Sequence, residues 1–162
     1  NVTGFVVPKA PCVASQVMSS LAKNRKSLEP SDSILVMACG LGTQSVKENL
    51  RDKKEVHTGC DTLFISTLDK TGNFLFERCS ACGDCVLDLT ACICPVTRCP
   101  KSLLNGPCGG SSHGKCEVDR DKDCVWILIY NELKEKGKLD NMKKIQKAKD
   151  YSNSIKPRGV KL

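Results

Sequence analysis

The chain has 162 residues, of which 12 are cysteine, 25 are Lys or Arg and 18 are Asp or Glu, giving a formal net charge of +7. This length suits one domain, or one domain with a small module. No apolar run approaches 18 residues and no signal-peptide pattern is present, which argues against a membrane protein and indicates a soluble, cytoplasmic one. In a reducing compartment, dense cysteine favours metal or cluster ligands over disulfides.

Three short apolar runs near the N-terminus predict buried strands at residues 4–7, 34–38 and 62–66. Their alternation with helical patterns favours a parallel sheet with crossover helices. We therefore expect a small Rossmann-like α/β part over residues 1–77. Three strands make a thin sheet, and the chain begins at Asn1 rather than Met, so further sheet could come from an upstream segment or a partner chain.

Two helices are predicted between these strands. The first is marked by apolar residues at helical spacing, namely Val13, Val17, Met18 and Leu21. The second carries Val46 and Leu50, and Thr43 is a candidate N-cap. The stretch "ACGLGTQS" at its start resembles a dinucleotide loop only in part, because Ser45 replaces the third glycine. A tight strand-to-helix turn is the simpler interpretation, and nucleotide or flavin binding through Gly40 and Gly42 is the alternative.

A turn at Gly72-Asn73 and a short strand with Phe74 and Phe76 on one face follow. They lead into a cysteine-rich, irregular module, which we place at residues 78–137. Its closing helix is predicted to run from Asp123 to a Gly137 stop, with one apolar side formed by Val125, Leu128, Ile129 and Leu133. Residues 138–162 are expected to form a basic, extended tail.

The strongest pattern is Cys79-x2-Cys82-x2-Cys85. Thiolates three residues apart can converge on one metal centre, and three in a row open the bacterial ferredoxin cluster motif. In that motif the fourth cysteine precedes proline and binds a second cluster. Cys94-Pro95 follows here after eight residues rather than three, so the match is partial, and by this analogy Cys94 would serve a different cluster from the first three.

More cysteines follow at longer intervals. With Cys92 set aside, eight candidate ligands remain, the number that two all-cysteine [4Fe–4S] clusters require: Cys79, Cys82, Cys85, Cys94, Cys99, Cys108, Cys116 and Cys124. The main alternative is structural zinc, although zinc ribbons use two separate C-x2-C pairs. Disulfide bonds between these cysteines would imply that the protein is secreted. Cys12, Cys39 and Cys60 are interpreted as small core or pocket residues rather than ligands.

The stretch "GGSSHGKCE" at residues 109–117 matches most of a P-loop, but Cys116 stands where a hydroxyl must bind magnesium. Pro107 precedes it where a strand is needed, and charged residues follow where a helix is needed. We therefore interpret Gly109, Gly110 and Gly114, together with Gly106, as residues that let the backbone pass close to an inorganic centre. Cys116 is then a ligand.

Residues 79–126 closely resemble the cysteine-rich C-terminal module associated with methylenetetrahydrofolate reductase, through the stretches "CGDCVL", "CPVTRCPKSLLNGPCGG" and "GKCEVD". The resemblance extends to "LVMACGLGTQSV" and "LKEKGKLD", and it is greatest to the small accessory subunit of the acetogen-type enzyme. Cys92 departs from the pattern, since a small residue is expected there. That family also carries a further N-terminal segment.

The resemblance implies an iron–sulfur electron-transfer subunit without a catalytic site of its own, working in one-carbon metabolism. Its partner would be the flavin-bearing TIM-barrel subunit that reduces methylenetetrahydrofolate. Two [4Fe–4S] clusters would pass electrons between that flavin and an external donor such as ferredoxin. In agreement, the sequence shows no plausible acid–base pair and no activated nucleophile.

The positive charge is concentrated at the C-terminal end. Residues 131–162 hold nine Lys and one Arg against two Glu and two Asp, a net of +6. A solvated surface is the simple interpretation. The alternative is a docking surface for an acidic protein or the catalytic subunit, formed by Lys143, Lys144, Lys147 and Lys149. Nucleic acid is disfavoured, because few aromatic residues accompany the charge.

Overall fold

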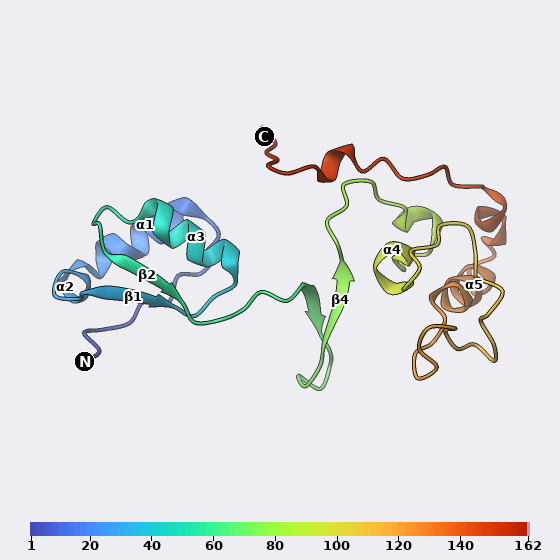
Figure 1. Ribbon diagram of the computed structural model, residues 1–162, viewed down its shortest axis with the longest axis horizontal. Helices are drawn as coiled ribbons and strands as arrows, with labels where there is room; N and C mark the ends of the chain where they lie inside the picture. The colour runs from blue at the N-terminus through green and yellow to red at the C-terminus, as the bar shows by residue number, and fades with distance from the viewer. Residues whose placement is uncertain (162) are drawn as a thin grey trace. The chain divides into compact units, whose positions relative to one another are not determined.

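The computed structural model describes residues 1–161, which form two compact units, Asn1–Leu63 and Phe64–Leu162 (Figure 1). The chain is a mixed α/β protein with two small sheets and a cysteine-rich region of little regular structure. No helix within residues 1–161 is long and apolar enough to cross a membrane.

The first unit is built around one strand–helix–strand element. Strands β1 (Ser33–Val36) and β2 (Glu55–Thr58) pair in parallel, and helix α3 (Gly40–Asn49) makes the crossover between them. Two further helices precede it, α1 (Ala14–Lys23) and α2 (Arg25–Leu28).

The core of this unit lies between the strands and the helices α1 and α3. Val17, Val36 and Val46 are buried together, one from each of these elements. Alternate residues of a strand point to opposite faces, so Leu35, next to Val36, is 64% exposed. The helices thus cover one face of the two-stranded sheet.

The sequence predictions for this unit were partly wrong. Residues 4–7 form no strand, and Phe5 is exposed. The apolar run at 62–66 ends in the antiparallel hairpin of the second unit instead of a parallel strand. The partner of β1 is β2, whose sequence "EVHT" is too polar to stand out as a strand. Helix α3 begins at Gly40 with Cys39 as N-cap, so Thr43 is not the cap.

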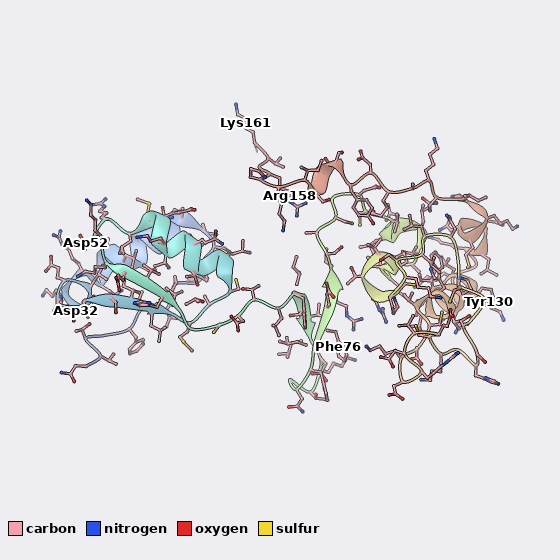
Figure 2. All side chains as sticks on the ribbon, in the orientation of Figure 1. Asp32, Asp52, Phe76, Tyr130, Arg158 and Lys161 are labelled. Atoms are coloured by element: carbon pink, nitrogen blue, oxygen red, sulfur yellow. The ribbon has the colours of Figure 1, made fainter. Side chains whose placement is uncertain are left out.

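The second unit begins with the hairpin of β3 (Ile65–Leu68) and β4 (Leu75–Cys79). The predicted turn is confirmed, since the Asp69 amide donates to the Phe74 carbonyl at 2.9 Å and Gly72 has a φ of +76°. Phe74 and Phe76 stack with ring centroids 6.3 Å apart, and Arg78 lies over the Phe76 ring. Figure 2 labels Phe76 on this hairpin.

Beyond the hairpin, regular elements are short until the closing helix. They are η1 (Leu87–Leu89), α4 (Pro95–Arg98), α5 (Val125–Glu135), η2 (Leu139–Lys143) and η3 (Ser152–Ser154). Ile129, Leu133 and Trp126 of α5 are almost fully buried, and they form the core with flanking side chains that include Leu103 and Met142. The cysteine-rich loops are therefore arranged around a single packed helix.

The ends of α5 follow from local chemistry. Cys124 is the N-cap, one residue after the predicted Asp123 start. The predicted stop at Gly137 is confirmed: its φ is +63°, which suits glycine, and the next amide, of Lys138, donates back to the Leu133 carbonyl at 2.8 Å. This is the Schellman arrangement, which satisfies free carbonyls at a helix end.

Candidate metal centre

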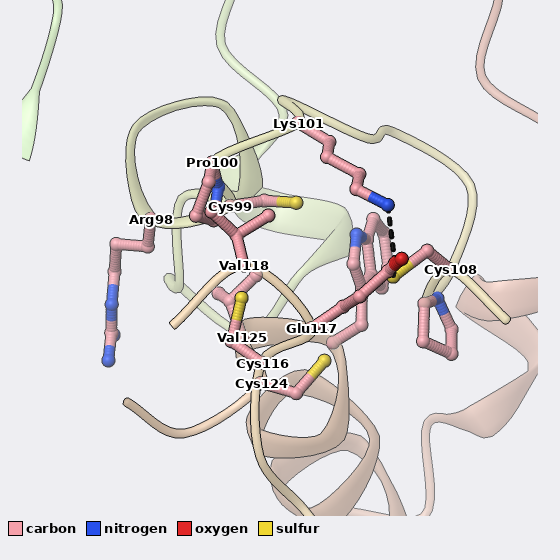
Figure 3. A pocket seen from close by; sticks show the side chains of 12 residues that line it. Arg98, Cys99, Pro100, Lys101, Cys108, Cys116, Glu117, Val118, Cys124 and Val125 are labelled. Atoms are coloured by element: carbon pink, nitrogen blue, oxygen red, sulfur yellow. Dashed lines mark hydrogen bonds and ion pairs between the residues drawn. The ribbon is translucent and has the colours of Figure 1, made fainter. Parts of the chain in front are cut away.

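Four of the eight predicted ligands surround one pocket in the second unit (Figure 3). They come from separate stretches of chain and are Cys99, Cys108, Cys116 and Cys124. Apolar side chains of Val125, Trp126 and Val118 form other parts of the wall. All twelve cysteines are free thiols in the structure, so disulfides do not account for this gathering.

Backbone pairing brings Cys116 and Cys124 to the pocket. The Cys116 amide donates to the Lys122 carbonyl at 2.9 Å, and the Cys124 amide donates to the Gly114 carbonyl at 2.7 Å. A bridge between Lys115 and Asp123 lies between these two bonds, and a 2.7 Å ion pair joins the same two side chains. The loop between the two cysteines is thereby closed, and both thiols are held at the start of α5.

Cys99 and Cys108 reach the pocket through the loop that follows α4. Cys99 is the C-cap of that helix, and its carbonyl accepts from the Ser102 amide at 2.8 Å. The Trp126 indole N–H donates to the Leu103 carbonyl at 3.0 Å, which fastens this loop to α5. Trp126 is thus a core residue that also holds this loop against α5.

The pocket has a charged rim. Lys101 and Glu117 form an ion pair there, and the Cys108 thiol donates to the same carboxylate at 3.1 Å. Lys101, and secondly Cys108, hold the pKa of the Glu117 carboxyl below its usual range. Arg98 also lines the pocket, and burial lowers the pKa of its guanidinium. Basic groups therefore stand beside the thiols, where they stabilise thiolate charge.

The other four predicted ligands lie outside this pocket. Cys79 ends β4, and its sulfur accepts a hydrogen bond from the Ala81 amide at 3.3 Å. Cys82 and Cys85 follow in the same loop. Cys94 is the N-cap of α4, a helix that packs against β4, and its sulfur lies 3.5 Å from the Thr97 hydroxyl.

Two basic residues of the C-terminal tail fasten the 79–85 loop. The Lys149 ammonium donates to the Asp84 carbonyl and lies 3.6 Å from the Asp84 carboxylate, and its side chain is only 2% exposed. The Arg158 guanidinium donates to the Ala81 carbonyl at 2.9 Å. Lys149 therefore does not belong to the docking surface predicted for the tail. Sequence reasoning missed both contacts, because no local pattern connects residues this far apart along the chain.

The tail also affects the chemistry of the loop. The pKa of the Cys82 thiol is lowered, first by a hydrogen bond with the backbone of Asp84 and secondly by the Lys149 ammonium, although burial opposes both. A lower pKa favours the thiolate, which is the form that binds metal.

The cysteine-rich segment holds strained backbone. Among the described residues, all five non-glycine residues with positive φ lie between Ala81 and His113. Ala81, at +52°, separates the first two cysteines, and Ala91 and Cys92 adopt the same region. Such conformations cost about 1–3 kcal/mol each and persist where the surroundings impose them, often at ligand sites.

The thiols are candidate ligands for two kinds of metal centre, zinc and a four-iron cluster. Within residues 1–161, no three His, Cys, Asp or Glu side chains stand close enough to hold a single metal ion. Tetrahedral zinc needs sulfurs about 4 Å apart, given Zn–S bonds near 2.3 Å. In a four-iron cluster each thiolate binds a different iron, so its sulfurs stand farther apart. Four free thiols around one pocket with a basic rim supply the number of donors that either tetrahedral zinc or a four-iron cluster takes.

The structure does not support nucleotide binding at residues 109–117 or at Gly40 and Gly42. No helix begins directly after Cys116, since the next one, α5, begins at Val125, and the Lys115 ammonium is paired with Asp123. Gly42 is buried in α3, where an added Cβ would lie 3.1 Å from Pro11. Cys12, Cys39 and Cys60 are exposed, so the core alternative for them was wrong, and Cys92, which was set aside as a ligand, is exposed as well.

Comparison with known proteins gave one match. A family model described as "Methylene-tetrahydrofolate reductase C terminal" matches residues 57–152, which is more than half of the chain and includes all eight candidate ligands. No curated protein and no solved structure matches the chain.

Proposed function

Because the chain belongs to the methylene-tetrahydrofolate reductase C-terminal family, we propose that it is an iron–sulfur electron-transfer subunit of such a reductase. The observation that carries this proposal is the pocket lined by Cys99, Cys108, Cys116 and Cys124. The eight thiols of residues 79–124 would hold two [4Fe–4S] clusters. When bound, such clusters accept and donate single electrons.

The residues around the thiols suit this role. The Ala81 amide already donates to the Cys79 sulfur, and hydrogen bonds of this kind tune cluster potential. Lys149 and the pocket-lining Arg98 place positive charge near the two groups of thiols. Apolar groups of Val125 and Trp126 shield one side of the pocket from water, which also affects potential.

The partner we propose is the flavin-bearing catalytic subunit of methylenetetrahydrofolate reductase, with ferredoxin or a similar protein as the external electron donor. Family membership supports the first partner. The exposed lysines of the tail, such as Lys147, support contact with an acidic donor. The β1–α3–β2 element supports a Rossmann-like first part, and we keep a cytoplasmic location as part of the proposal.

The second candidate is a structural zinc subunit of the same complex without a redox role. Thiolates bind zinc well, so the same cysteines could serve it. We prefer the iron–sulfur centre because the eight candidate thiols match the ligands of two four-iron clusters, whereas zinc ribbons use two separate C-x2-C pairs.

The deciding experiment measures iron, acid-labile sulfide and zinc in the full chain purified without oxygen, together with the visible spectrum. We expect about eight iron and eight sulfide per chain and a broad absorbance that bleaches with dithionite. A colourless protein carrying one or two zinc would overturn the electron-transfer proposal and establish the zinc alternative.

A matched pair of variants tests the ligands. Cys82→Ala is expected to lose about half of the bound iron, since one of two four-iron clusters loses a ligand. Cys92→Ala, which removes an exposed cysteine of the same segment, is expected to keep all of it. Unchanged iron in Cys82→Ala would remove that residue from the ligand set.

A further inference from the structure

We propose that the eight thiols divide by position into two four-cysteine sites, one made of Cys99, Cys108, Cys116 and Cys124 and the other of Cys79, Cys82, Cys85 and Cys94. This inference rests on the proposed iron–sulfur function and adds the assignment of each ligand. It reverses the sequence expectation for Cys94, which by analogy with ferredoxins would serve a different cluster from Cys79–Cys85.

The first site is defined by the pocket at the start of α5 (Figure 3). Cys99 is the C-cap of α4 and Cys108 lies in the following loop. Cys116 and Cys124 lie in the two hydrogen-bonded segments that precede α5. No other candidate cysteine lines this pocket among the described residues. Four is also the number of protein ligands that one four-iron cluster takes.

Helix α4 separates the two sites. Cys94 is its N-cap and Cys99 its C-cap, and Cys99 alone of the two lines the pocket. The division of these two cysteines therefore rests on the pocket, which Cys99 lines and Cys94 does not.

The second site is defined by β4, its following loop and the start of α4. Helix α4, which begins after Cys94, packs against β4, which ends at Cys79 where the loop begins. The loop itself is fixed by the tail, through Lys149 to Asp84 and Arg158 to Ala81. These contacts hold the backbone carbonyl groups on either side of Cys82.

Charge is balanced separately at the two sites. The pocket has Lys101 and Arg98 among its lining residues, and the loop has Lys149 bonded to Asp84. The present donation from Cys108 to Glu117 requires a protonated thiol, so ligation by Cys108 would break it. Lys101 remains to neutralise Glu117 when that happens. Each site therefore carries its own cation, as expected for two distinct anionic centres.

Pairs of substitutions test the division, with iron and sulfide per chain as the readout. Cys99→Ala, Cys116→Ala and Cys82→Ala are each expected to lower bound iron about twofold. Cys99→Ala with Cys116→Ala should lose no more than either alone, because both belong to one site. Cys82→Ala with Cys116→Ala should lose nearly all iron, because the pair disables both sites.

The same design places Cys94. Combined with Cys82→Ala, Cys94→Ala should leave about half of the iron, whereas combined with Cys116→Ala it should leave almost none. The opposite pattern would overturn our assignment and restore the ferredoxin-like one. Electron paramagnetic resonance of the reduced single variants gives a second readout, since variants of one site should show the same remaining signal.

Controls distinguish the loss of a metal ligand from the loss of folding. Cys92→Ala must retain all iron, and far-ultraviolet circular dichroism must show that each variant is folded. A variant that fails to fold is replaced by its Ser version at the same position. If the unsubstituted chain holds zinc instead of iron, the electron-transfer proposal fails, yet the same pairs scored by zinc content still decide the division. Loss of all metal in Cys99→Ala with Cys116→Ala would refute it.

Discussion

Gly83 shows how a single residue can set the shape of the cysteine loop. Its φ is +81°, in the region that favours glycine, and a Cβ added there would lie 2.6 Å from the Cβ of Asn153 in the tail. Both the backbone conformation and the close approach of the tail therefore require a residue without a side chain.

We expect Gly83→Ala to lower the free energy of unfolding by about 1–3 kcal/mol, because it adds a strained conformation and a steric clash. Gly109→Ala is the matched control, since a Cβ there meets nothing within 4 Å. The measurement is urea unfolding followed by the fluorescence of Trp126, the sole tryptophan of the chain. Equal midpoints for both variants would contradict the structure of the loop.

At the scale of elements, the turn of the β3–β4 hairpin depends on Asp69. Its carboxylate accepts hydrogen bonds from the Thr71 hydroxyl at 2.5 Å and from the Phe74 and Asn73 amides at 3.0 Å each. The Thr71 hydroxyl first, and then the Phe74 amide, lower the pKa of Asp69 from 3.8 to about 2. The charged form is thus favoured in the folded hairpin.

This lowered pKa predicts an acid-sensitive turn. A depressed folded-state pKa contributes stability that is fully present above pH 3.8 and is lost as the pH falls toward about 2. Asp69→Asn should remove that dependence, whereas Asp121→Asn, at an exposed position of the same unit, should leave it. Amide exchange of Phe74 between pH 5 and 2 measures the effect. Equal protection of the Phe74 amide at pH 5 and at pH 2 would contradict this prediction.

The elements also show what sequence patterns can predict. The Gly72-Asn73 turn and the Gly137 stop were predicted because each depends on local chemistry. Strand β2 was missed because "EVHT" has little apolar character, and only pairing with β1 makes it a strand. The apolar run at 4–7 shows the reverse case, because apolar residues form a strand only where a neighbouring strand is available.

At the scale of the whole chain, spacing along the sequence identified the candidate thiols but not their grouping. Close spacing suggested that Cys79, Cys82 and Cys85 act together, and it gave no means to group the later cysteines. Cys99 and Cys124 line one pocket because backbone pairing and the hydrogen bond from Trp126 to Leu103 hold segments together that are distant in sequence. The match to the reductase family was correctly predicted, because it rests on long specific stretches.

The tail contacts predict a long-range effect of truncation. A chain ending at Lys147 lacks Lys149 and Arg158, so the 79–85 loop should lose its anchors, and its amides should exchange faster. Amides of α5 should be unaffected, because Ile129 and its neighbours pack without the removed residues. A chain ending at Arg158 is the control, since it keeps both anchors. Unchanged exchange in the shorter chain would contradict the anchoring.

The position of these anchors also has a consequence for biosynthesis. A ribosome makes the 79–85 loop well before it makes Lys149 and Arg158, which lie near the C-terminal end. Throughout that interval the loop lacks the cations that hold Asp84 and Ala81. The loop therefore gains these two anchors only after residues 149–158 have been made, so its folding waits for a segment that lies far along the chain.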